Sequence, residues 1–129
     1  MWRNFQERLS NDPRFSRRFY ALRKAQQTLS EAQARSNAGD AKGFYALLYK
    51  ALNTYLADKF HKPSGVAALD EVVEGLHQKN IGPNIIRAVK DIYEACDLVR
   101  FAATSHDPAQ MKQHLAQARE IITLLEKKL

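Results

Sequence analysis

Residues 38–60, which read AGDAKGFYALLYKALNTYLADKF, decide the fold of this 129-residue chain. Large apolar side chains recur along this stretch at intervals of three and four, and they are Phe44, Leu47, Leu48, Ala51, Leu52, Tyr55 and Leu56. That period matches one face of an α-helix. Asp40 is a good N-cap because its carboxylate can accept a hydrogen bond from a backbone N–H of the first turn. The stretch therefore predicts an amphipathic helix from Asp40 to Phe60.

The preceding residues predict a partner helix from Asp12 to Arg35, which Asp12 can cap and in which Pro13 suits the first position. Its apolar stripe consists of Phe15, Phe19, Leu22, Leu29 and Ala32. We expect the helix to end before Gly39, since Gly39 or Asn37 can adopt the left-handed conformation that often follows a helix. Because the connection is short, the two helices should form an antiparallel hairpin similar to a tetratricopeptide unit.

Three more helices are expected, over residues 66–78, 83–103 and 107–129, with Asp107-Pro108 repeating the start seen at Asp12-Pro13. Their predicted inner faces are Leu69, Val72, Val73 and Leu76; then Ile85, Val89, Ile92, Tyr93, Cys96 and Val99; then Met111, Leu115, Ala118, Ile122, Leu125 and Leu129. Ile81, between the third and fourth helices, should point inward. The sequence thus predicts an all-α fold, a small five-helix bundle in a single domain of residues 1–129, with a basic leader at 1–12 and the bundle at 13–129.

Composition agrees with a helical domain, since 45% of the residues are hydrophobic, 26% are charged, and there are only five Gly and four Pro. No apolar run reaches the length that a membrane span needs, and no signal peptide is recognisable. The single cysteine, Cys96, excludes an internal disulfide and a thiolate zinc cluster.

The net charge of +6 is unevenly distributed, because residues 1–24 hold seven basic and two acidic residues, while the remainder is nearly neutral. Three interpretations remain open: a solvated helix face, a juxtamembrane segment that meets anionic lipid, and a segment that binds a phosphate backbone. The candidates for a membrane surface are Arg3, Arg8, Arg14, Arg17 and Arg18.

No catalytic or metal-binding pattern stands out, so we expect no enzymatic activity, no metal and no cofactor. His61, His77, His106 and His114 lack zinc-motif spacing and are expected at the surface. Cys96 lies on a predicted inner face, and the adjacent Asp97 should raise its pKa. The acidic residues Asp70, Glu71 and Glu74 are interpreted as a solvated face.

Tyr93, Cys96, Asp97 and Arg100 share one helical stripe, because they are spaced by three and four. Arg100 at the edge of a core suggests a half-buried ion pair with Asp97. The alternative is that this stripe is an anchor for a protein partner.

Two stretches, residues 38–60 and the segment YEACDLVRFA at 93–102, resemble the cytoplasmic C-terminal region of BatD-type aerotolerance proteins. The resemblance extends from about residue 20 to the end. The matching positions are Gly39, Asp40, Phe44, Tyr45, Tyr55, Leu56, Ala57, Lys59, Cys96, Asp97, Arg100 and Phe101. Among these, six polar positions are candidate site residues: Asp40, Tyr45, Tyr55, Cys96, Asp97 and Arg100.

The resemblance implies a helical domain that follows a transmembrane helix and lies on the cytoplasmic side of the bacterial inner membrane. It also implies protein partners of two kinds, von Willebrand A-domain membrane proteins and a MoxR-type AAA+ ATPase. The function expected from it is that of a non-enzymatic protein–protein interaction module in oxygen tolerance. The alternative is a basic helical domain that binds nucleic acid through its arginine-rich first helix.

Overall fold

The computed structural model describes residues 13–62, 68–101 and 107–129, and side chains from residue 20 onward except at 63–67 and 101–106. These residues form five helices and no strand, so the predicted all-α bundle is confirmed. The helices are α2 (Pro13–Asn37), α3 (Ala41–Lys59), α4 (Leu69–Gln78), α5 (Pro83–Phe101) and α6 (Pro108–Lys128).

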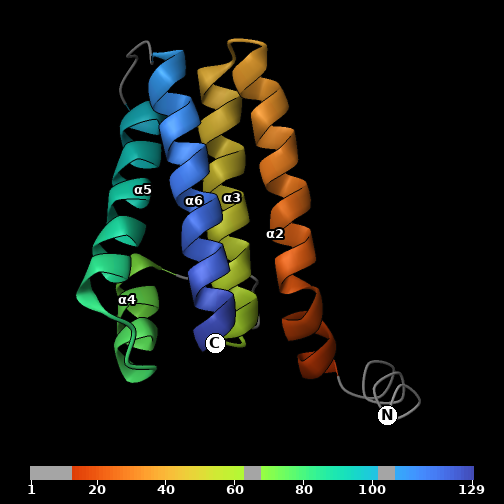
Figure 1. Cartoon of the computed structure of the whole chain (residues 1–129), viewed down its shortest axis with the longest axis vertical. Coiled ribbons are helices and arrows are strands. Elements are labelled where there is room, and N and C mark those ends of the chain that lie inside the picture. Colours follow the sequence, from red (N-terminus) through yellow and green to blue (C-terminus); the bar gives the residue numbers. More distant parts are fainter. Residues whose placement is uncertain (1–12, 63–67, 102–106) are drawn as a thin grey trace.

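The four long helices pack as an up–down–up–down bundle (Figure 1). Each is antiparallel to the two helices beside it, in the order α2, α3, α5, α6 around the bundle. The hairpin of α2 and α3 was expected from their short connection. Helices α3 and α6 run parallel and also contact each other across the middle. Helix α4 is a short addition at one end, where it packs on α5.

Helix α3 is the most deeply buried element of the described bundle. It contacts α2, α5 and α6, and most of its residues are buried. Its predicted stripe is buried from Phe44 to Leu56, except that Leu47 is half-buried. Its C-terminal half is buried on every side, so that Asn53, Asp58 and Lys59 are enclosed together with the apolar residues. Polar side chains in such positions need partners, and this requirement creates the contacts described below.

The helix ends follow local sequence signals. Asp40 accepts a hydrogen bond from the backbone N–H of Gly43 at 3.0 Å, and Asp107 accepts one from that of Ala109 at 3.1 Å. Gly39 has a φ of 75°, the left-handed conformation that favours glycine. These three predictions are confirmed. His61 and Asn80 also have positive φ, after the ends of α3 and α4.

Two predictions about inner faces and helix bounds need correction. Ile86, not Ile85, is the buried isoleucine at the start of α5, with 4% of its surface exposed. Helix α4 begins at Leu69 rather than at Val66, which lies outside the described residues. Ile81 is buried as expected. The side chains of Phe15 and Phe19 lie outside the part that the structure describes.

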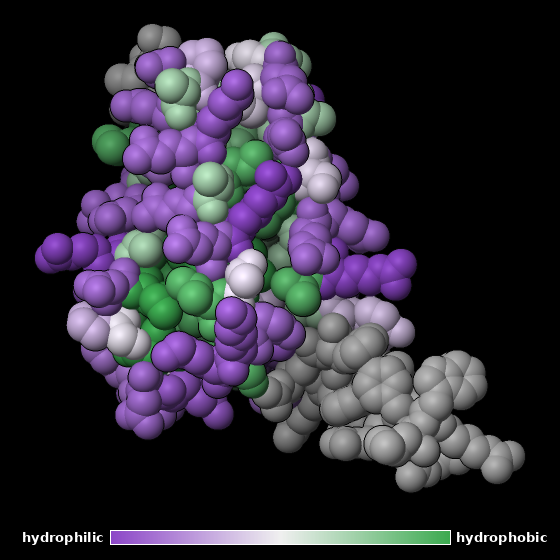
Figure 2. Space-filling model, in the orientation of Figure 1, coloured by the Kyte–Doolittle hydropathy of each residue, from purple (hydrophilic) through white to green (hydrophobic). Residues whose placement is uncertain are grey.

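Helix α4 contacts the end of α3 at Gly75. A Cβ atom at that position would lie 3.0 Å from the Phe60 ring, so the close approach favours glycine. The outer side of α4 leaves Leu69 and Val73 half-buried in an open groove. In the view of Figure 2 the surface is mostly hydrophilic, and hydrophobic side chains gather near the end of the bundle that carries α4.

Candidate functional site

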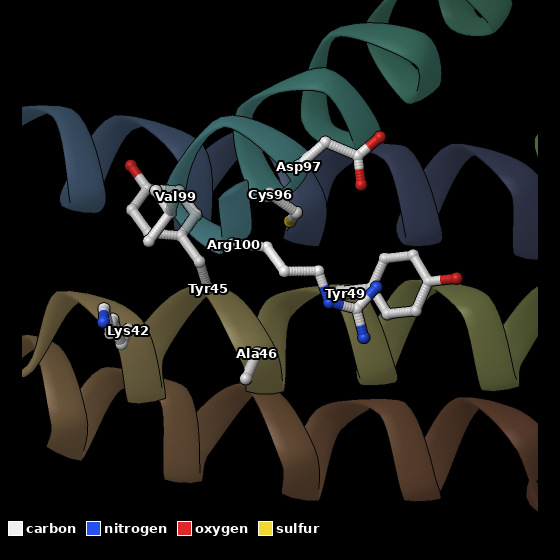
Figure 3. A pocket seen from close by; sticks show the side chains of 8 residues that line it. All are labelled: Lys42, Tyr45, Ala46, Tyr49, Cys96, Asp97, Val99 and Arg100. Carbon is white, nitrogen blue, oxygen red and sulfur yellow. The ribbon is translucent and has the colours of Figure 1, made fainter. Parts of the chain in front are cut away.

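A surface pocket with a volume of about 260 Å³ lies between α3 and α5, and we call it the α3–α5 pocket. Helix α3 contributes four of its lining residues and α5 contributes the other four (Figure 3). They are Lys42, Tyr45, Ala46 and Tyr49 from α3, and Cys96, Asp97, Val99 and Arg100 from α5. Each set follows helical spacing, so each helix turns one continuous strip toward the pocket.

The floor of the pocket is apolar and holds no reactive thiol. Cys96 is 6% exposed, and burial raises the pKa of its thiol to about 12, with a further rise from Asp97 and an opposing effect from Arg100. Burial likewise raises the pKa of Tyr45 to about 12, with a smaller contribution from Cys96. Both groups are therefore protonated at neutral pH, and a protonated thiol is a poor nucleophile.

Tyr45 connects the pocket to α6. Its hydroxyl lies 2.8 Å from Nδ1 of His114, and the two rings meet edge to face. His114 is half-buried in this contact, so the expectation that all four histidines lie at the surface is wrong for this one. His61 and His77 are exposed, while His106 lies outside the described residues.

Arg100 is held by aromatic contacts rather than by a carboxylate. Its guanidinium carbon lies 5.6 Å from the centre of the Tyr49 ring, a cation–π arrangement. Tyr49 in turn meets Tyr93 edge to face at 5.4 Å, and the Tyr93 hydroxyl accepts a 2.8 Å hydrogen bond from Nδ2 of Asn53. This chain of contacts runs from the buried middle of α3 to the rim of the pocket.

The predicted half-buried ion pair between Asp97 and Arg100 is wrong. Both side chains are exposed, and no described ion pair joins them. In Figure 3 the carboxylate of Asp97 points away from the guanidinium, which lies against Tyr49. The physical reason is that an exposed arginine can keep its hydration and still stack on an aromatic ring, so it gains little from an ion pair.

The structure brings together four of the six polar positions that the resemblance marks: Tyr45, Cys96, Asp97 and Arg100. Asp40 instead caps α3 and lies 3.5 Å from Arg35. Tyr55 lies six residues beyond Tyr49 along α3 and belongs to a different cluster, so neither Asp40 nor Tyr55 lines the pocket.

That second cluster joins α3 to α6 and includes a residue that sequence reasoning missed. Tyr55 donates a 2.6 Å hydrogen bond to Glu126, and Nζ of Lys59 lies 3.0 Å from the same carboxylate. Burial and the hydrogen bond to Glu126 raise the pKa of Tyr55. Glu126 lies among charged residues at the end of the chain, and only the position of α6 against α3 distinguishes it from a solvated glutamate.

The five candidates for a membrane surface cannot be placed on the pocket or on any other described surface. Arg3 and Arg8 lie outside the described residues. Arg14, Arg17 and Arg18 fall within the first two turns of α2, where the helix backbone is described and the side chains are not.

Neither a metal centre nor a membrane span is found in the described part of the chain. No group of three or more His, Cys, Asp or Glu residues within residues 13–62, 68–101 and 107–129 could hold a metal ion. None of the five helices combines the length and the apolar character needed to cross a bilayer.

No protein-family model, curated protein or solved structure matched this chain. The resemblance to BatD-type proteins therefore stays a prediction that rests on the residues quoted for it. The α3–α5 pocket is the candidate site because residues from two distant segments of the sequence converge on it.

Proposed function

We propose that this chain is a non-enzymatic module that binds a protein partner through the α3–α5 pocket. The observation that carries the proposal is the convergence of Tyr45, from residues 38–60, with Cys96, Asp97 and Arg100, from residues 93–102. Both segments carry the resemblance to BatD-type proteins. Helices α3 and α5 contact each other directly, so both walls of the pocket are regular helices, which lowers the entropic cost of binding.

The chemistry of the pocket favours binding over catalysis. The only thiol of the chain is protonated at neutral pH, as the raised pKa of Cys96 requires. The volume of about 260 Å³ is smaller than the ~300–1,000 Å³ usual for small-molecule and cofactor sites. A space of that size suits one or two side chains of a protein partner.

The resemblance supplies the first candidate partners, a MoxR-type AAA+ ATPase and von Willebrand A-domain proteins. It also supplies the proposed location, the cytoplasmic face of a bacterial inner membrane, and the proposed role in oxygen tolerance. The net charge of +5 on residues 1–24 supports this location, since cytoplasmic flanks of membrane spans are rich in Lys and Arg.

The partner assignment can be tested with purified proteins and a matched pair of variants. The full chain is immobilised, and binding of the MoxR-type ATPase and of a von Willebrand A domain is measured by interferometry. Ala46→Trp fills the exposed rim of the pocket and should abolish binding, whereas Ala34→Trp makes the same change on an exposed position of α2 and should not. The proposal is contradicted if neither protein binds, or if Ala46→Trp binds as the unaltered chain does.

The role of the leader has a separate test. Vesicles that contain phosphatidylglycerol should retain the full chain better than a chain that lacks residues 1–12, and neutral vesicles should retain neither, because the attraction is electrostatic. Equal retention of the two chains by the anionic vesicles would remove the lipid contact from the proposal.

The alternative function is nucleic-acid binding, which the concentration of positive charge in residues 1–24 favours. It predicts retention of DNA or RNA that falls steeply with salt, because phosphate contacts release counterions. Changing Arg14, Arg17 and Arg18 together to glutamine should then abolish retention. Unchanged retention in that variant would exclude the alternative.

A further inference from the structure

We infer that the α3–α5 pocket selects an acidic protein segment, with one carboxylate bound by Arg100, a second near Lys42, and a large apolar side chain on the apolar surface between them. The inference rests on the proposed function and adds the chemistry of the partner. It is argued from three features of the pocket: its two cations, the orientation of Arg100 and the apolar surface between them.

The first feature is a pair of exposed cations that lack a carboxylate. Neither Lys42 nor Arg100 forms an ion pair among the described residues, although other basic residues of the bundle do. In Figure 3 the two lie toward opposite ends of the pocket, with Tyr45 and Ala46 between them. Lys42 and Tyr49, on which Arg100 stacks, are separated by about 10 Å along α3. An acidic segment that crosses the pocket meets positive charge at both ends.

The second feature is the preorganised guanidinium of Arg100. The contact with Tyr49, at 5.6 Å from the ring centre, uses no N–H donor in a hydrogen bond, so the donors of the guanidinium can match the two oxygens of a carboxylate. Tyr49 is held by Tyr93, which is held by Asn53. These contacts fix the ring beside the arginine, which favours one position of the guanidinium and lowers the entropic cost of binding an anion.

The third feature distinguishes a protein segment from a phosphate backbone. Between the two cations the pocket offers the exposed Ala46 and the half-buried ring of Tyr49, with the buried Tyr45, Cys96 and Val99 behind them. A large apolar side chain that covers this surface gains free energy by leaving water. A leucine or phenylalanine next to a glutamate or aspartate meets both requirements. Asp97 at the rim opposes every anion, so it disfavours a partner with dense negative charge more than a segment with one or two carboxylates.

The probe is a short peptide of glutamate and leucine, with one control peptide in which glutamine replaces glutamate and another in which alanine replaces leucine. Binding to the ¹⁵N-labelled full chain is followed by NMR. We expect chemical-shift changes centred on residues 42–49 and 96–100. Each control peptide should bind at least about tenfold more weakly, because the glutamine peptide loses a charge-assisted hydrogen bond and the alanine peptide loses a buried side chain.

Variants locate the effect. Arg100→Gln and Lys42→Gln should each weaken binding of the acidic peptide by about three- to tenfold, whereas Lys50→Gln, an exposed lysine of α3 outside the pocket, should not. Tyr49→Leu should also weaken binding although Arg100 is intact, because it removes the ring that orients the guanidinium. Circular dichroism should be unchanged in Arg100→Gln, because the side chain is exposed.

The inference is overturned if the glutamine peptide binds as tightly as the acidic one, or if Arg100→Gln and Lys50→Gln behave alike. Tighter binding of an oligothymidylate at the same residues would also overturn it, in favour of a phosphate ligand. If the ATPase or the von Willebrand A domain binds but Arg100→Gln has no effect, the proposed function stands and this inference fails. If the acidic peptide binds at the pocket but neither protein does, the inference stands and the assigned partners fail.

Discussion

Replacing Glu126 by glutamine tests how much the contact between α3 and α6 contributes to stability. The carboxylate accepts a hydrogen bond from Tyr55 at 2.6 Å and faces Nζ of Lys59 at 3.0 Å, and the Lys59 side chain is only 6% exposed. Glutamine keeps the shape and one acceptor oxygen but removes the negative charge. The change therefore isolates the electrostatic part of the contact.

The expected loss follows from these contacts. A hydrogen bond to a charged group contributes about 1.5–3 kcal/mol, against about 0.5–1.5 kcal/mol for a neutral pair, so two such bonds lose about 2 kcal/mol. The Glu126 side chain is 32% exposed, so solvent screens part of the interaction. We therefore expect Glu126→Gln to lower the free energy of unfolding by about 1.5 kcal/mol. For a domain of this size, the melting temperature should fall by about 5–8 °C.

The assay is urea unfolding followed by circular dichroism, with Glu120→Gln as the matched control on the exposed side of α6. That control should change the free energy of unfolding by less than about 0.5 kcal/mol. In a double-mutant cycle with Lys59→Met, the losses of unfolding free energy in the two single variants should add up to about 1 kcal/mol more than the loss in the double variant. Equal losses for Glu126→Gln and Glu120→Gln, or strict additivity in the cycle, would refute the reasoning.

Three further outcomes are expected. Stability should fall as the pH rises from about 9 to 12. The side chains of Cys96, Tyr45 and Tyr93 have pKa values of about 12 in the folded chain and lower values in the unfolded chain, so the unfolded state loses these protons first. Denaturation midpoints that stay constant over this pH range would contradict this. Labelling of Cys96 by iodoacetamide at pH 8 should be at least about 100-fold slower in the native chain than in urea, and equal rates would show an accessible thiolate. Gly39→Ala should lower the free energy of unfolding by about 1 kcal/mol, because Gly39 has a φ of 75°. Gly82→Ala should be neutral or stabilising, because the added Cβ would have no atom within 4 Å. Equal effects of the two variants in urea titrations would be inconsistent with this.

Local signals made most of the fold predictable. The cap at Asp40, the left-handed Gly39 and the stripe from Phe44 to Leu56 each depend on residues within one or two helical turns, and all three are confirmed. Ile85 packs against the core but is only half-buried, whereas Ile86 is fully buried, and the helical period explains why the sequence did not separate them. Counting back from Val89 by four gives Ile85 and by three gives Ile86, and only the contact of α5 with its neighbours decides between them.

The candidate site was predictable only in its residue types. The resemblance marked Tyr45, Cys96 and Arg100, but their meeting in one pocket depends on how α3 and α5 pack. Partners far apart in the sequence, such as Tyr45 and His114 or Tyr55 and Glu126, leave no periodic signal. Arg100 illustrates the limit, since the helical spacing suggested Asp97 as its partner, whereas the ring of Tyr49 on another helix was within reach.

The place of α6 in the bundle bears on how the protein is made. This helix contacts α2, α3 and α5, yet it is the last of the five to leave the ribosome. Until then, the apolar surfaces of α2, α3 and α5 that α6 covers face water, although α3 still packs against α2 and α5. We therefore expect a chain that stops before residue 107 to aggregate more readily than the full chain.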